Sequence, residues 1–139
     1  MLVDGKWVPT FPKARYLIGK REFEHWNDEG DGEQQAILGD GVRPIFEAGL
    51  AELVGTDHRI SPEVCLTPSP GHAPGHASVI IESEGQSAVI TGDLTHHPCQ
   101  MAHPDWATSF DSDGQVARAT RAKLFAEWTD RPILVIGTH

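Results

Sequence analysis

The segment Thr67–Ile80, TPSPGHAPGHASVI, places two histidines four residues apart and sets a glycine directly before each of them. In a helix the two side chains would share a face, but Pro70 and Pro74 lack amide donors and favour extended geometry in the residues before them. Glycine permits tight turns and close backbone approach. The segment therefore predicts a tight loop, which either aims His72 and His76 at a fixed point or is a surface turn with two solvated histidines.

Apolar strands flank this loop in the sequence. VCLTP from Val64 leads into it, ASVIIES from Ala77 follows it, and SAVITG from Ser87 comes next. The turn Glu84-Gly85-Gln86 joins the last two as a hairpin. Near the end of the chain, PILVIGTH predicts another strand over Ile133–Ile136. These strands suggest one sheet with the histidine loop at its edge.

Apolar spacing predicts two helices. In the first, Pro44 fits the first turn, Gly55 closes the end, and the apolar stripe is Val42, Ile45, Phe46, Gly49, Leu50 and Leu53. In the second, Ser112 and Gln115 form a capping box, Asp130 and Pro132 end the helix, and the apolar face is Val116, Thr120, Leu124, Phe125 and Trp128.

The first third of the chain gives weaker signals. Asp4-Gly5 predicts a hairpin turn, Ala14–Gly19 a short strand and KREFEHW a helical turn or two, whereas NDEGDGEQQ from Asn27 reads as an exposed loop. Strands interleaved with helices indicate an α/β fold, a sheet with flanking helices, rather than an all-β barrel. No linker divides the 139 residues, so residues 1–139 are interpreted as a single domain.

Composition excludes several classes of partner. Eleven Lys and Arg against twenty Asp and Glu give a formal charge of -9, which disfavours binding to nucleic acid or an anionic membrane. No apolar run reaches the ~20 residues of a membrane span, and the first residues do not resemble a signal peptide. Two distant cysteines form no disulfide framework. We therefore expect a soluble, cytoplasmic protein.

Three of the predicted strands run into turns that carry side chains able to bind metal. His72 follows the first, Asp93 the third and His139 the last. Because side chains at the ends of neighbouring strands converge at one edge of a sheet, the pattern predicts a His, Asp, His cluster. Imidazoles suit zinc and similar ions, and a carboxylate can bridge two metals, so the cluster favours hydrolysis by a metal-activated water.

The motifs TPSPGHAPGHAS, VITGD and VIGTH, in this order, resemble the later metal-binding motifs of the metallo-β-lactamase fold hydrolases. The resemblance implies a partial αββα fold, mostly its later half, and a site for two divalent metal ions, zinc, iron, manganese or cobalt. It implies that His72 binds one ion, Asp93 bridges both and His139 binds the other, with His76 supporting the loop. The family's HxHxDH segment is not present in the sequence, so the resemblance also implies an incomplete domain.

The resemblance is greatest to the lactonase and methyl parathion hydrolase-like branch, and it implies a small-molecule ester, lactone or phosphotriester substrate. His96 lies three residues after Asp93, where such lactonases carry a tyrosine, so His96 is either a proton donor or substrate contact or a solvated loop histidine. Two alternatives stay open. One is a glyoxalase II-like thioesterase, and the other is a non-catalytic truncated fragment that self-associates as a homo-oligomer through an exposed sheet edge.

Overall fold

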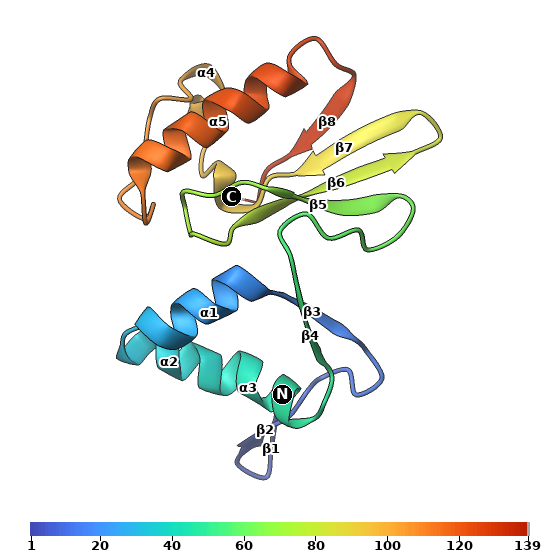
Figure 1. Cartoon of the computed structure of the whole chain (residues 1–139), viewed down its shortest axis with the longest axis vertical. Coiled ribbons are helices and arrows are strands. Elements are labelled where there is room, and N and C mark those ends of the chain that lie inside the picture. Colours follow the sequence, from blue (N-terminus) through green and yellow to red (C-terminus); the bar gives the residue numbers. More distant parts are fainter. Residues whose placement is uncertain (139) are drawn as a thin grey trace. The chain divides into compact units, whose positions relative to one another are not determined.

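The computed structural model describes residues 1–138. They fall into two compact units, Met1–Gly55 and a second that begins at Thr56, and each unit is described by itself below (Figure 1). Within the described range, no helix is both long enough and apolar enough to cross a membrane. The predicted ligand His139 lies outside the described residues.

The first unit contains a small hairpin, a pair of parallel strands and a run of short helices. The hairpin turns at Asp4 and Gly5, both with positive φ, as predicted. The parallel pair joins residues far apart in sequence, since Tyr16 is the partner of Ala51. In chain order the elements are β1 (Leu2–Val3), β2 (Lys6–Trp7), β3 (Tyr16–Gly19), α1 (Lys20–Glu29), α2 (Gly32–Ile37), the π-helix η1 (Leu38–Val42), α3 (Arg43–Glu47) and β4 (Ala51–Val54).

Two predictions for the first unit were wrong. The expected helix from Val42 ends at Glu47, because Gly49 adopts a φ of +69 that terminates it, and the following apolar residues form β4 instead. The expected loop from Asn27 is largely helical. Asp31 caps α2 by accepting hydrogen bonds from the backbone N–H groups of Glu33 and Gln34, which stabilises a helix in a polar segment.

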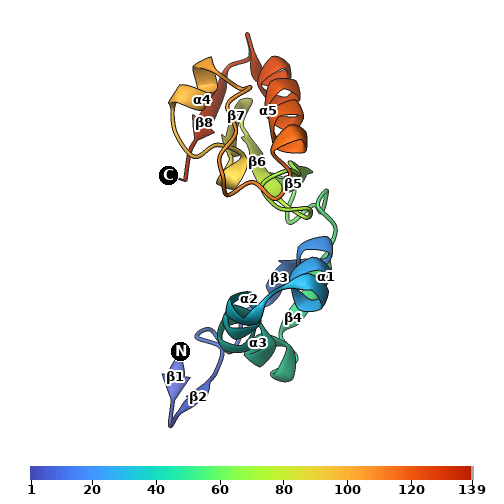
Figure 2. The same ribbon diagram turned by 90° about the vertical axis from the view of Figure 1, so that its left-hand side faces the viewer.

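The second unit is a four-stranded sheet in the order β5-β6-β7-β8, flanked by α5 (Figures 1 and 2). The strands β5 to β7 are antiparallel neighbours, whereas β8 is parallel to β7. All four strands were predicted, and the unit has the mixed α/β character that the sequence indicated. The elements are β5 (Val64–Pro68), β6 (Ala77–Ser83), β7 (Gln86–Ile90), the 3₁₀ helix η2 (Gly92–Leu94), α4 (Cys99–Ala102), α5 (Gly114–Trp128) and β8 (Ile133–Ile136).

The core of this unit lies between the sheet and α5. Val89 has no exposed surface and pairs in register with Ile80 on one side and Val135 on the other, so these side chains form a row across one face. Leu124 and Trp128 of α5 pack on that row. Each fully buried side chain of this size contributes roughly 1.5–3 kcal/mol through removal of apolar surface from water.

The predicted details of α5 need two corrections. Its N-cap is Asp113 rather than Ser112, because the Asp113 carboxylate accepts from the backbone N–H groups of Gln115 and Val116. The buried face of α5 also begins one residue later than predicted, at Ala117 and not at Val116. Val116 is exposed, and the buried positions are Ala117, Arg121, Leu124 and Trp128.

Candidate metal centre

The strand directions of the second unit bring two predicted ligands together. Since β5 and β7 are both antiparallel to β6, their carboxyl ends lie at the same edge of the sheet. His72 lies in the loop after β5, and Asp93 lies in η2, directly after β7. The Nε2 atom of His72 is 3.3 Å from Oδ2 of Asp93. Both side chains are partly exposed, so the pair faces an accessible edge.

His96 lies beside this pair. Its ring centroid is 5.0 Å from that of His72. His72, Asp93 and His96 each offer one ligand atom, and the three atoms lie within 4.8 Å of one another. Imidazole nitrogens with a carboxylate oxygen are donors that suit zinc and related divalent ions, and small side-chain rotations would bring all three atoms to one ion. The donor set therefore fits a metal ion.

His76, the second histidine of the loop, supports the site from behind. Its Nε2 atom accepts a hydrogen bond of 3.0 Å from the backbone N–H of Asp93. Because that N–H can only donate, the ring proton of His76 is on Nδ1, which lies 2.8 Å from the hydroxyl of Ser69. Both ring nitrogens are thus engaged, which favours His72 over His76 as the ligand and fixes the backbone that carries the Asp93 carboxylate.

Buried hydroxyl groups extend this support into the sheet. Ser69 and Ser78 are almost fully buried, and their hydroxyl oxygens are 2.9 Å apart. The Ser78 hydroxyl donates to the carbonyl of Thr91, two residues before Asp93. The three segments that carry His72, His76 and Asp93 are therefore linked by a continuous set of hydrogen bonds, and hydrogen bonds of this kind restrict the ligand positions.

Two glycines permit the close contacts of the site. Gly92 has a φ of +54, and a Cβ atom there would lie 2.7 Å from Nε2 of His76. Gly71 has a φ of +132, and a Cβ atom there would lie 2.3 Å from the Cα atom of Ala117. The backbone of the histidine loop thus packs directly on the first turn of α5, which no larger residue allows.

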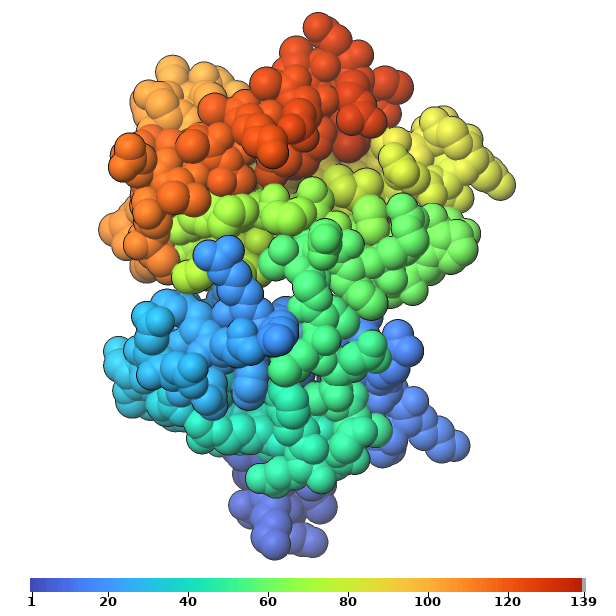
Figure 3. Space-filling view, in the orientation of Figure 1, coloured from blue at the N-terminus to red at the C-terminus, as the bar shows by residue number. Residues whose placement is uncertain are grey.

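Replacement of Gly71 by alanine is expected to destabilise the chain by about 2–3 kcal/mol, because the added methyl group overlaps backbone atoms of α5 and the φ angle is unfavourable for an L-residue. Urea denaturation measures this. Gly85→Ala is the matched control, since Gly85 has a φ of +75 but open space around its Cβ position. It lies in the β6–β7 hairpin that projects from the surface (yellow in Figure 3). Equal losses for the two variants would contradict the packing argument.

Two further charged residues lie behind His72. The side chain of Asp111 has no exposed surface, and its Oδ1 atom is 3.5 Å from Nδ1 of His72. Arg121 is also fully buried, with Nη2 at 3.8 Å from Oδ2 of Asp111. The guanidinium donates hydrogen bonds to the carbonyls of Leu94, Pro104 and Trp106. Burial lowers the pKa of Arg121 and the nearby Asp111 opposes that effect.

Sequence reasoning did not assign a role to Asp111 or Arg121. A signal for Arg121 was present, because it lies one turn before Leu124 on the face of the helix that carries Ala117 and Trp128. A charged residue on the apolar face of an amphipathic helix requires a buried partner. No comparable signal marks Asp111, which lies in a loop with other acidic and polar residues.

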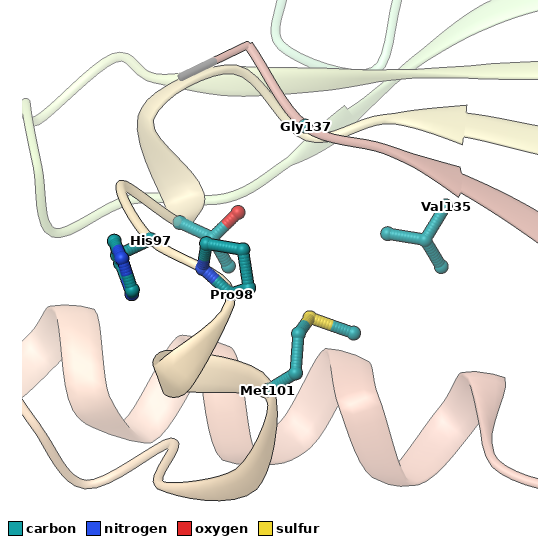
Figure 4. Close-up of a pocket in the computed structure, with 6 residues that line it drawn as sticks. His97, Pro98, Met101, Val135 and Gly137 are labelled. Carbon is teal, nitrogen blue, oxygen red and sulfur yellow. The ribbon is translucent and has the colours of Figure 1, made fainter.

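A small pocket lies next to the loop that carries His96 (Figure 4). It has a volume of about 190 Å³ and lies between α4 and the end of β8. Its lining is Thr95, His97, Pro98, Met101, Val135 and Gly137. His72, Asp93 and His96 are not among these residues, so the pocket adjoins the loop of the metal centre without including these three side chains.

Comparison with known proteins identifies the family of the chain. A family model described as the metallo-beta-lactamase superfamily matches residues 5–139. No curated protein matches the chain. The chain resembles a solved hydrolase, AbOPH, of the beta lactamase superfamily with a TM-score of 0.78 and 26% identity, over 93% of this chain and 48% of that one.

Two lactonases are also similar in structure. AidC, a dizinc quorum-quenching lactonase, matches with a TM-score of 0.75 and 23% identity, over 97% of this chain and 52% of its own. An N-acyl homoserine lactone hydrolase with its product bound at the catalytic metal center matches with a TM-score of 0.63 and 20% identity. The match covers 87% of this chain and 45% of that one. The chain therefore spans about half the length of these structures, and at such identities the lactonases show the fold alone.

Proposed function

The chain belongs to the metallo-beta-lactamase superfamily, and from this premise we propose that it forms part of a metal-dependent hydrolase of lactone, ester or phosphotriester bonds. The observation that carries the proposal is the group of His72, Asp93 and His96 at the carboxyl edge of the sheet. The similarity to the hydrolase AbOPH, at 26% identity, supports the same class of reaction, and the two lactonases share the fold.

In this proposal His72, Asp93 and His96 hold a divalent ion, zinc in the first instance, with iron, manganese or cobalt as alternatives. The ion supplies activation of a water molecule and polarisation of the carbonyl or phosphoryl group under attack. The family resemblance further implies that His139 would help to hold a second ion, to which Asp93 would also contribute. His76 keeps the backbone of Asp93 in place through its hydrogen bond of 3.0 Å, so that the carboxylate stays at the edge of the sheet.

The proposed reaction is tested with the 139-residue chain and three substrates, an N-acyl homoserine lactone, an aryl ester and an aryl phosphotriester. We expect hydrolysis of at least one substrate after addition of zinc, manganese, cobalt or iron(II), and loss of that activity with a chelator. A chain that binds metal stoichiometrically but hydrolyses none of the three would contradict hydrolysis by these 139 residues, while the metal site would still be supported.

His96 is expected to contribute to metal affinity. His96→Ala should weaken zinc binding more than about tenfold, because it removes one of three donors, whereas His97→Ala should leave it unchanged, since the exposed His97 is outside the group. Calorimetric titration with zinc measures both. If His96→Ala lowered only the rate of hydrolysis and kept full metal affinity, His96 would be a proton donor or substrate contact and not a ligand.

A further inference from the structure

Two buried polar atoms face each other behind the metal centre. Nδ1 of His72 and Oδ1 of Asp111 are 3.5 Å apart. Both atoms are buried, and neither has a hydrogen-bond partner elsewhere among the described residues. Leaving a polar atom buried without a partner costs about 1–3 kcal/mol, so the arrangement is favourable only if the two atoms serve each other.

The Asp111 carboxylate is fixed in this position from its other side. Its Oδ2 atom accepts a hydrogen bond of 3.2 Å from the backbone N–H of Thr108 and lies 3.8 Å from Nη2 of Arg121. The backbone N–H of Ser112 donates to the carbonyl of His72 at 2.9 Å, and that of Asp113 donates to the carbonyl of Gly71 at 2.9 Å. The segments that carry Asp111 and His72 are therefore joined by their backbones as well as by their side chains.

We propose that Asp111 is a positioning residue, which holds the imidazole of His72 in the tautomer with its proton on Nδ1. The Nε2 lone pair is then directed toward Asp93 and His96, where a metal ligand is needed. The role assigned to Asp111 rests on the proposed function. The tautomer of His72, in contrast, can be measured in the metal-free chain. A carboxylate bound to the far nitrogen also makes the imidazole a more basic ligand.

Asp93 competes for the same proton, because its Oδ2 atom is 3.3 Å from Nε2 of His72. The two carboxylates differ in exposure. The Asp93 side chain is 37% exposed and water can solvate it, whereas the Asp111 side chain has no exposed surface. Among residues 1–138, Asp111 therefore has no alternative donor for Oδ1, and the proton is more stable on Nδ1.

An asparagine at position 111 should reverse the tautomer. The Thr108 N–H and the Arg121 guanidinium are both donors, so the amide oxygen must take the place of Oδ2. The amide NH₂ group then takes the place of Oδ1 and donates to Nδ1 of His72. This hydrogen bond requires Nδ1 to be unprotonated and places the proton on Nε2, where it blocks metal binding.

The test is long-range ¹H–¹⁵N correlation NMR of the metal-free 139-residue chain, recorded at a pH at which the His72 ring is neutral, with the His72 signals assigned by their loss in His72→Gln. We expect Nδ1 to be protonated and Nε2 to be bare in the unsubstituted chain. The opposite tautomer there would overturn the proposal, and this result needs no Asp111 variant to fold. It would leave the hydrolase proposal untouched.

Variants extend the test to metal binding. Asp111→Asn should show the reversed tautomer and bind zinc about 10–100-fold more weakly. Asp113→Asn is the matched control, since Asp113 caps α5 two residues away and asparagine is an equally good cap. It should change neither the tautomer nor the affinity. An Asp111→Asn chain that stays folded, keeps the Nδ1–H tautomer and binds zinc as tightly as before would refute the assignment.

Discussion

Replacement of Asp93 by alanine is expected to weaken zinc binding by more than about 100-fold, a larger effect than the loss of a group that only supports a ligand. The carboxylate is the one anionic donor in the group of three, beside His72 and His96. Its removal takes away both a ligand oxygen and the charge that favours a divalent cation at this edge of the sheet. Calorimetric titration of the metal-free chain with zinc measures the change.

The same variant should have little effect on folding without metal. The Asp93 side chain is 37% exposed, so water weakens its 3.3 Å contact with His72. The hydrogen bond to His76 comes from the Asp93 backbone, which alanine retains. We expect the free energy of unfolding to change by no more than about 0.5 kcal/mol. Asp105→Ala is the control for the loss of one negative charge, because Asp105 is exposed and outside the group. Equal zinc affinities for Asp93→Ala and Asp105→Ala would contradict the assigned site.

Replacement of Arg121 by methionine is expected to cost about 3–5 kcal/mol of stability, which is typical when one partner of a buried charged pair is removed. The guanidinium donates to three backbone carbonyls, at 3.1 Å, 3.1 Å and 2.7 Å, and lies 3.8 Å from the buried Asp111 carboxylate. Methionine fills similar volume but supplies no donor. The three carbonyls and the carboxylate would then be buried without these partners.

Urea denaturation of the metal-free chain measures this second effect. Arg118→Met is the matched control, since Arg118 is exposed on the same helix and should change stability by no more than about 0.5 kcal/mol. A loss below about 1 kcal/mol for Arg121→Met would show that the guanidinium does not hold the loops around Leu94 and Trp106 as the structure indicates.

The sheet of the second unit was predictable because its signals are local. Continuous apolar runs bounded by turn residues identified all four strands, and the prolines and glycines around His72 identified a loop rather than a helix. The motif order in the sequence also indicated the superfamily to which the chain belongs. The approach of His72 and Asp93 followed from one general rule, that strand ends on neighbouring strands share an edge of the sheet.

The errors arose where a single residue overrides a longer pattern. The apolar stripe from Val42 favoured a long helix, but Gly49 ends the helix and the later part pairs with β3 as a strand. The polar segment after Asn27 favoured a loop, but Asp31 caps a helix there. Tertiary pairing and capping decide such segments, and neither is visible in residue spacing alone.

The residues that position the metal ligands were harder to predict from the sequence than the ligands themselves. Asp111 is 39 positions after His72 in the sequence, and only the packing of the histidine loop on α5 brings the two together. That packing depends on Gly71, where any side chain would meet Ala117. A contact that depends on close backbone approach between distant segments leaves no periodic pattern in the sequence.

We expect His72, Asp93 and His96 to hold a metal ion together. Anomalous X-ray diffraction tests this most directly, with crystals of the 139-residue chain grown with zinc and data recorded at the zinc absorption edge. We predict an anomalous peak bounded by Nε2 of His72, the carboxylate of Asp93 and the ring of His96. Two results would contradict this site: electron density in which the three side chains are fully ordered with no anomalous peak among them, or zinc bound only at other residues.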